Sequence, residues 1–160
     1  MRKLGIIAVL SLMALALAAV PAIAANPHFV GAPDCTENQQ DLTITCTGSV
    51  AGLGNQDVKV VVSAVGTADV VCINPAGRRA PGQDTTISAS GSQIIEDPKN
   101  GRINFDVTTA APKDPTPQEA GCPNRKWDAR ITDVDFTSVT ISIFQPPNAN
   151  QPVLRRTFNL

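Results

Sequence analysis

The chain has 160 residues, a formal net charge of −1 and 42% hydrophobic residues, which fits a single globular domain. A mildly acidic chain lacks the clustered Lys and Arg of a nucleic-acid-binding protein, so that class is excluded. One histidine and two methionines leave few ligands for zinc or copper sites.

Residues 1–24 have the features of a secretory signal peptide. Arg2 and Lys3 form a basic start, residues 4–20 are apolar or small, and Ala22-Ile23-Ala24 supplies the small residues of a cleavage site. No Cys stands at that site, so we expect no lipoprotein. A retained anchor is the alternative, because about 20 apolar residues span a bilayer.

Cleavage would leave one domain, residues 25–160, with no membrane span. Removing Arg2 and Lys3 leaves 11 basic against 14 acidic residues, a net charge of about −3. We therefore expect an extracytoplasmic protein, secreted or periplasmic.

The four cysteines of an exported chain predict two disulfides, for which three pairings exist. Cys35 and Cys46 flank a short polar segment that suits a hairpin-closing bridge, and Cys72 would then join Cys122. The chain has no C-x-x-C spacing and only His28 as a histidine, so we interpret the cysteines as structural. We expect no metal site and no cofactor.

In chain order, alternating apolar and polar residues predict strands within residues 42–46, 58–62, 70–72, 103–107, 127–131, 134–136 and 139–143. Asn100-Gly101 between two runs predicts a β-hairpin. Trp127 is in phase with Ala129 and Ile131, which predicts a core position. The apolar phase then changes, which predicts a bulge or tight turn near Thr137-Ser138.

Thirteen prolines and eleven glycines separate these runs, and no long helical pattern occurs. The longest irregular stretch is Ala110 to Pro123. We predict an all-β fold, an antiparallel, immunoglobulin-like β-sandwich of about eight strands. Its core would consist of Val, Ile and Phe, and two disulfides would support it.

Several short motifs recur in one group of proteins. They are Asn26-Pro27-His28-Phe29-Val30, Ala51-Gly52-Leu53-Gly54, Val71-Cys72-Ile73-Asn74-Pro75-Ala76-Gly77 and Gly121-Cys122-Pro123-Asn124. Over residues 26–145 the chain resembles small, signal-peptide-bearing secreted bacterial proteins. The resemblance implies a secreted β-sandwich in which Cys72 pairs with Cys122. The group brings no established activity, so no catalytic residue is implied.

We assign no catalytic residue. A Ser-His-Asp or Cys-His mechanism would need His28, and no G-x-S-x-G elbow accompanies it, so we interpret His28 as an ordinary first-strand residue. Four aspartates could supply the acid and base of an extracellular hydrolase: Asp106, Asp128, Asp133 and Asp135. We interpret them instead as solvated strand positions.

Arg78-Arg79 is the most prominent candidate for partner binding, at the tip of a Pro- and Gly-framed loop. Arg125-Lys126 would lie near it if Cys72 pairs with Cys122. The leading hypothesis is a non-enzymatic module that binds an unknown protein or cell-surface partner or has an envelope role. The alternative is a protease inhibitor that presents Ala76 to Gln83, and a carboxylate-based hydrolase ranks third. The oligomeric state and the partner do not follow from the sequence.

Overall fold

The computed structural model describes residues 26–160, so the predicted signal peptide lies outside the described part. In this described part, nine antiparallel strands form two sheets. Sheet A consists of β1 (His28–Phe29), β2 (Asp34–Asn38), β3 (Thr43–Ala51) and β7 (Ile103–Thr108). Sheet B consists of β4 (Val58–Ile73), β5 (Arg79–Pro81), β6 (Thr85–Ile95), β8 (Asp128–Phe144) and β9 (Leu154–Asn159). Within residues 26–160, no helix is long and apolar enough to cross a membrane.

Sheet A is built around β3. One edge of β3 pairs first with β2 and then with β1, and its other edge pairs with β7. Cys35 and Cys46 lie directly opposite each other in the β2–β3 pair and are joined by a disulfide. The predicted hairpin-closing bridge is therefore confirmed.

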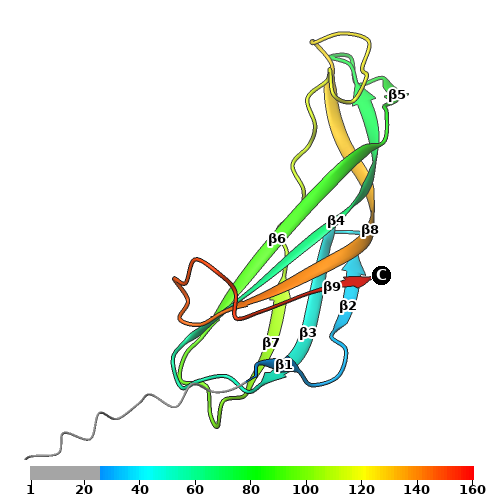
Figure 1. Cartoon of the computed structure of the whole chain (residues 1–160). Coiled ribbons are helices and arrows are strands. Elements are labelled where there is room, and N and C mark those ends of the chain that lie inside the picture. The colour runs from blue at the N-terminus through cyan, green and yellow to red at the C-terminus, as the bar shows by residue number, and fades with distance from the viewer. Residues whose placement is uncertain (1–25) are drawn as a thin grey trace, which may run out of the picture.

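Sheet B is dominated by two strands of 16 and 17 residues, β4 and β8, which pair along their whole length. β6 and β5 follow the other edge of β4, and β9 follows the end of β8. Figure 1 shows that sheet B curls into a half-barrel whose upper end, with β5, extends beyond sheet A. The all-β class is confirmed. The immunoglobulin-like arrangement is not, because a long curled sheet replaces two sheets of equal extent.

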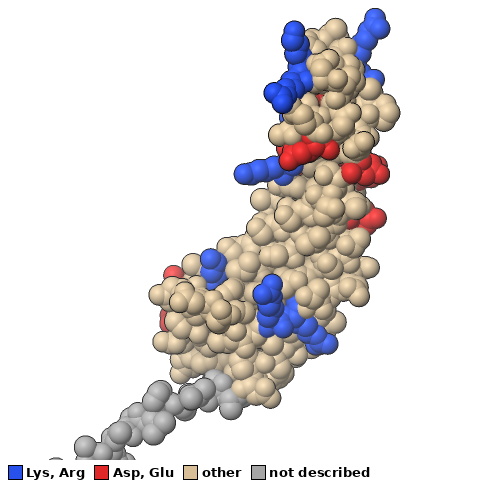
Figure 2. Space-filling view, turned by 45° about the horizontal axis from the view of Figure 1, so that its top comes forward, with Lys and Arg blue, Asp and Glu red and all other residues tan. Residues whose placement is uncertain are grey.

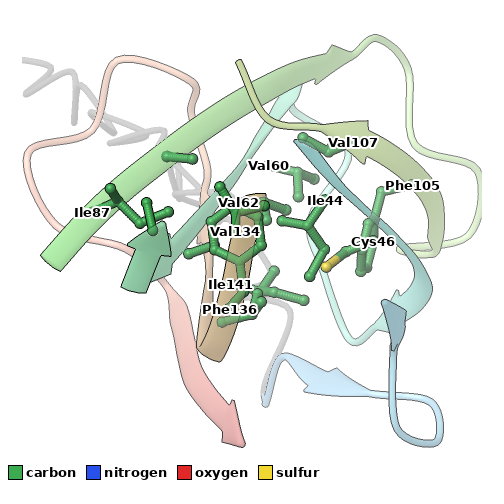
Figure 3. Packing of buried hydrophobic residues seen from close by; sticks show 14 of the residues in the cluster. Ile44, Cys46, Val60, Val62, Ile87, Phe105, Val107, Val134, Phe136 and Ile141 are labelled. Carbon is green, nitrogen blue, oxygen red and sulfur yellow. The ribbon is translucent and has the colours of Figure 1, made fainter. Parts of the chain in front are cut away.

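The core lies where the two sheets face each other (Figure 3). Ile44 and Phe105 of sheet A and Val62 and Phe136 of sheet B point into one cluster, and all four are at most 3% exposed. Alternate positions of each strand supply these side chains, as the period of two predicts.

The predicted phase change at Thr137 is a β-bulge. The β4–β8 register shifts between Val65 and Gly66, so Thr137 has no opposing residue. A Cβ atom at Gly66 would collide with the backbone oxygen of Asp135, which explains a glycine opposite the bulge. A second shift, which was not predicted, leaves out Thr132.

The Asn100-Gly101 turn forms, but it does not join two paired strands. Both residues have positive φ, 55° and 65°, and Lys99 and Arg102 bridge across the turn. β6 before the turn belongs to sheet B, whereas β7 after it pairs with β3. The turn therefore moves the chain from one sheet to the other.

Candidate recognition tip

The β4–β5 loop is organised by the side chain of Asn74. Asn74 Oδ1 accepts hydrogen bonds from the backbone N–H groups of Ala76 at 2.9 Å and Arg78 at 2.8 Å. The Asn74 N–H donates to the Arg78 carbonyl at 2.9 Å, which closes the loop. An asparagine that accepts from the residues after it fixes a turn, so this loop has its own internal support.

A second loop, between Cys122 and β8, is built in the same way. Asn124 Oδ1 accepts from the N–H of Lys126 at 2.9 Å, and the Asn124 carbonyl accepts from the N–H of Trp127 at 3.2 Å. Both loops thus place basic residues directly after an asparagine turn. Arg78 and Arg79 follow Asn74, and Arg125 and Lys126 follow Asn124.

The Cys72–Cys122 disulfide joins the bases of the two loops, with 5.6 Å between the Cα atoms. Each asparagine stands two residues after one of these cysteines. Arg79, Ile73 and Asp128 form one row across β5, β4 and β8 at this end of the sheet. The two loops therefore share one end of the molecule, as the sequence analysis expected if Cys72 paired with Cys122.

We call Arg78, Arg79, Arg125 and Lys126 the basic tip. All four residues are exposed, and Figure 2 shows Lys and Arg side chains gathered at this end of the molecule. The one ion pair within residues 26–160 joins Arg130 to Asp114 at 3.3 Å. The cations of the basic tip thus have no carboxylate partner among the described residues.

Trp127 corrects a prediction. It is half-buried, lies just before β8 and is not part of the hydrophobic core. Phase alone placed it with Ala129 and Ile131, but the regular strand starts only at Asp128. The only tryptophan of the chain therefore follows Lys126 of the basic tip, partly open to solvent.

A capped turn, which was not predicted from the sequence, holds the second loop in place. Glu119 Oε2 accepts from the N–H and the hydroxyl of Thr116, at 2.8 and 2.7 Å. The Glu119 N–H donates to Thr116 Oγ1 at 3.3 Å, which completes a capping box. The Gly121 N–H donates to the Gln118 carbonyl and the Cys122 N–H to the Pro117 carbonyl, the pattern of a Schellman motif.

This turn was visible in the sequence as Thr116-Pro117-Gln118-Glu119, with Gly121 at the end. It buries Ala120 completely and sets the position of Cys122. The pKa of Glu119 is lowered below its ordinary value of 4.5. The larger cause is the hydrogen bond from the Thr116 backbone, and the smaller is the hydrogen bond from the Thr116 hydroxyl.

The other candidate residues lie elsewhere. His28 is exposed in β1, where its Nδ1 is 2.9 Å from the Asn26 carbonyl oxygen. Asp106 belongs to sheet A and Asp128 to the tip row. Asp133 and Asp135 line a hollow of about 210 Å³ together with Asp69. Within residues 26–160, no group of three or more His, Cys, Asp or Glu side chains is arranged to hold a metal ion.

The segment Ala76–Gln83, considered as an inhibitor loop, is only partly a loop. Residues Arg79–Pro81 form β5 and pair with β4, so the exposed turn ends at Arg78. Comparisons of the chain with protein-family models, with curated proteins and with solved structures found no match.

Proposed function

We propose that this chain is an exported, non-enzymatic module that binds an acidic protein or cell-surface partner through the basic tip. The observation that supports this proposal is a set of four exposed cations without a carboxylate partner in residues 26–160. Three of them lie on two loops joined by a disulfide, and Arg79 directly follows the first loop as the first residue of β5. The two disulfides suit an oxidising compartment outside the cytoplasm. In this proposal the binding layout is immunoglobulin-like, because loops at one end of a β-fold recognise the partner.

Two physical arguments favour binding at this end. Loops that are already fixed lose little conformational entropy when a partner binds, so more of the interaction energy appears as affinity. Arg and Trp are also among the residues most often responsible for affinity at interfaces, and the half-buried Trp127 directly follows Lys126. Charge complementarity mainly raises the association rate, so binding should weaken as salt increases.

The test compares two variants with the same change in charge. One replaces Arg78, Arg79, Arg125 and Lys126 by Ala, and the control replaces four other cations by Ala: Lys59, Lys99, Arg102 and Arg155. Retention on a poly-glutamate surface and on envelopes of the producing cells is measured at about 50 and 150 mM NaCl. We expect the tip variant to lose at least about tenfold in retention and the control to keep it. Equal retention of both variants would contradict the proposal.

A protease inhibitor is the second candidate, because the loop that ends at Arg78 is joined at its base to Cys122. An inhibitor must present its loop to the protease and resist cleavage. Incubation of the oxidised chain with a trypsin-like enzyme, followed by mass spectrometry, distinguishes the two functions. Slow cleavage after Arg78 or Arg79 together with loss of enzyme activity would support an inhibitor. Rapid and complete cleavage there would exclude it.

A further inference from the structure

The outer edge of β6, opposite β4, is open at Thr86 and Ser88. β6 pairs with β4 without a register shift. The Ser90 carbonyl accepts the Ala110 N–H at 2.9 Å, which shows that it points away from β4. Residues two apart on an antiparallel strand direct their backbone groups to the same side. The N–H and C=O groups of Thr86 and Ser88 therefore also point away from β4. Within residues 26–160 these groups have no backbone partner.

This edge is one wall of a cleft of about 580 Å³. The other wall is the segment from Ala110 to Pro115, and Glu119 also lines the cleft. Pro112 and Pro115 have no N–H, so this segment cannot pair with β6 as a regular strand. Thr86, Ser88 and Ala111 are small, which leaves the backbone of the edge accessible. The two walls meet at the hydrogen bond from Ala110 to Ser90, and the cleft extends from there along Ser88 and Thr86.

Three charged side chains line the cleft: Lys113, Asp114 and Glu119. Asp114 already accepts the Ile131 N–H at 2.8 Å and pairs with Arg130. Glu119 has no cation partner in residues 26–160. It lies toward the Thr85 end, because the neighbouring Ala120 carbonyl accepts the Gln83 N–H at 2.8 Å. This end of the cleft therefore favours a cationic residue.

We infer that the edge of β6 binds an extended peptide, which adds as a strand between β6 and residues 111–115 and sets a Lys or Arg beside Glu119. Backbone hydrogen bonds to Thr86 and Ser88 provide the affinity in this mode of recognition, and alternate side chains provide specificity. A second copy of the chain is disfavoured, because residues 110–115 flank the edge on which it would pair. The inference is independent of the proposed function, since the cleft and the basic tip share no residue.

The test uses the oxidised chain and the peptide acetyl-Lys-Thr-Val-Thr-Val-Thr-Lys-amide. A lysine at each end places an ammonium group near Glu119 in either chain direction. Amide hydrogen exchange is followed by NMR at millimolar peptide. We expect the N–H groups of Thr86 and Ser88 to exchange at least about tenfold more slowly, while that of Ile87, which faces β4, is unchanged. Unchanged exchange at Thr86 and Ser88 would overturn the inference. So would protection that rises with protein concentration when no peptide is present.

Three variants sharpen the result. Ser88→Pro removes an outward N–H inside the cleft, and Ser92→Pro changes the same edge outside it. We expect only Ser88→Pro to abolish peptide binding. Ala111→Leu narrows the cleft without changing β6 and should also weaken binding, which covers the case in which a proline variant does not fold. Unchanged affinity in Ala111→Leu or in a folded Ser88→Pro variant contradicts the inference.

Glu119 can be tested separately from the edge of β6. Glu119→Gln should weaken binding of the lysine peptide roughly two- to fivefold, the range of an exposed ion pair. The same variant should bind a peptide with acetylated lysines as well as the parent does. Equal affinity of parent and variant for the lysine peptide would contradict the inference that a Lys or Arg of the peptide lies beside Glu119. The peptide-binding test and the test of the basic tip use different variants, so failure of this inference can be distinguished from failure of the proposed function.

Discussion

Gln39 shows how single polar side chains replace backbone partners in this fold. Its side-chain NH₂ donates to the Val134 carbonyl at 2.7 Å, and its side-chain oxygen accepts the Val134 N–H at 3.3 Å. Glu37 accepts the Phe136 N–H at 2.9 Å on the same edge of β8. At Val134 and Phe136, one edge of β8 is paired with neither β4 nor β9. Side chains of β2 and of the turn after it cover this edge. An edge satisfied in this way is a poor template for aggregation.

We predict that Gln39→Ala destabilises the fold by about 1 kcal/mol, because the Val134 backbone loses two hydrogen bonds. The variant should also associate at high concentration through the exposed edge. Denaturant unfolding and sedimentation velocity measure the two effects. Gln40→Ala is the control, since the Gln40 side chain forms no hydrogen bond with residues 26–160. Equal stability of the two variants would show that the side chain does not replace a strand.

At the scale of elements, the capped turn from Thr116 to Cys122 links the cleft to the basic tip. Its first half supplies Glu119 to the cleft, and its last residue forms the disulfide at the base of the tip. The capping box satisfies the start of the turn and the Schellman motif its end, so one turn is stable without a longer helix. The turn thus fixes two candidate sites with a few hydrogen bonds.

The ionised Glu119 should make this turn sensitive to acid. Its pKa is lowered in the folded state, because the Thr116 backbone and hydroxyl donate to the carboxylate. A group of this kind stabilises the folded state above its unfolded pKa, and the contribution is lost as pH falls below about 4.5 through the folded value. We predict that the stability difference between the parent and Glu119→Gln is largest near neutral pH and disappears in acid. Urea unfolding from pH 7 to pH 2 tests this, and a difference independent of pH would contradict it.

At the scale of the whole molecule, the ends differ in how they are held together. The lower end has two facing sheets and a shared core, whereas the upper end has sheet B, the 110–127 segment and one disulfide (Figure 1). The Cys72–Cys122 bridge closes 50 residues and the Cys35–Cys46 bridge 11. On the chain-entropy model these contribute about 4 and about 3 kcal/mol.

Replacing Cys72 and Cys122 by Ala should therefore cost more stability than replacing Cys35 and Cys46 by Ala, as measured by guanidinium unfolding. The Cys72/Cys122 variant should also lose retention on the poly-glutamate surface, because both loops of the basic tip are released. The Cys35/Cys46 variant should keep that retention. Full retention by both folded variants would show that a fixed tip is not needed for binding.

The sequence predicted strand faces well and strand lengths poorly. Alternation reports which side chains point inward, and it identified Ile44, Val62 and Phe105 correctly. It did not show that β4 runs from Val58 to Ile73, because small residues such as Ala64 and Ala68 continue the buried phase. The phase change between Ile131 and Val134 was also present in the sequence. Periodicity cannot report pairing partners, so the crossing at Asn100-Gly101 and the curl of sheet B were not predictable from it.

The residues of the basic tip could be predicted from the sequence, whereas the cleft beside β6 could not. Arg78, Arg79, Arg125 and Lys126 could be chosen from loop position and the expected disulfide. The cleft forms because residues 110–115 lie beside β6, which is far from them in the sequence. No local sequence pattern reports that these two segments are close in space. Local motifs are different, since the Thr116–Gly121 capping signals could have been recognised.

The repeated Cys-x-Asn arrangement separates the chemistry of the tip from the stability of the fold. Residues 75–78 and 125–126 lie beyond the last paired rows of β4 and β8 and beyond the disulfide that joins their loops. Substitutions there would leave the core unchanged as long as Asn74, Asn124 and the glycine of the first loop remain. A lineage could therefore exchange one partner for another by altering five positions, Pro75, Ala76, Arg78, Arg125 and Lys126, while it keeps the same exported scaffold. The same positions are the natural ones at which to build a library of binders.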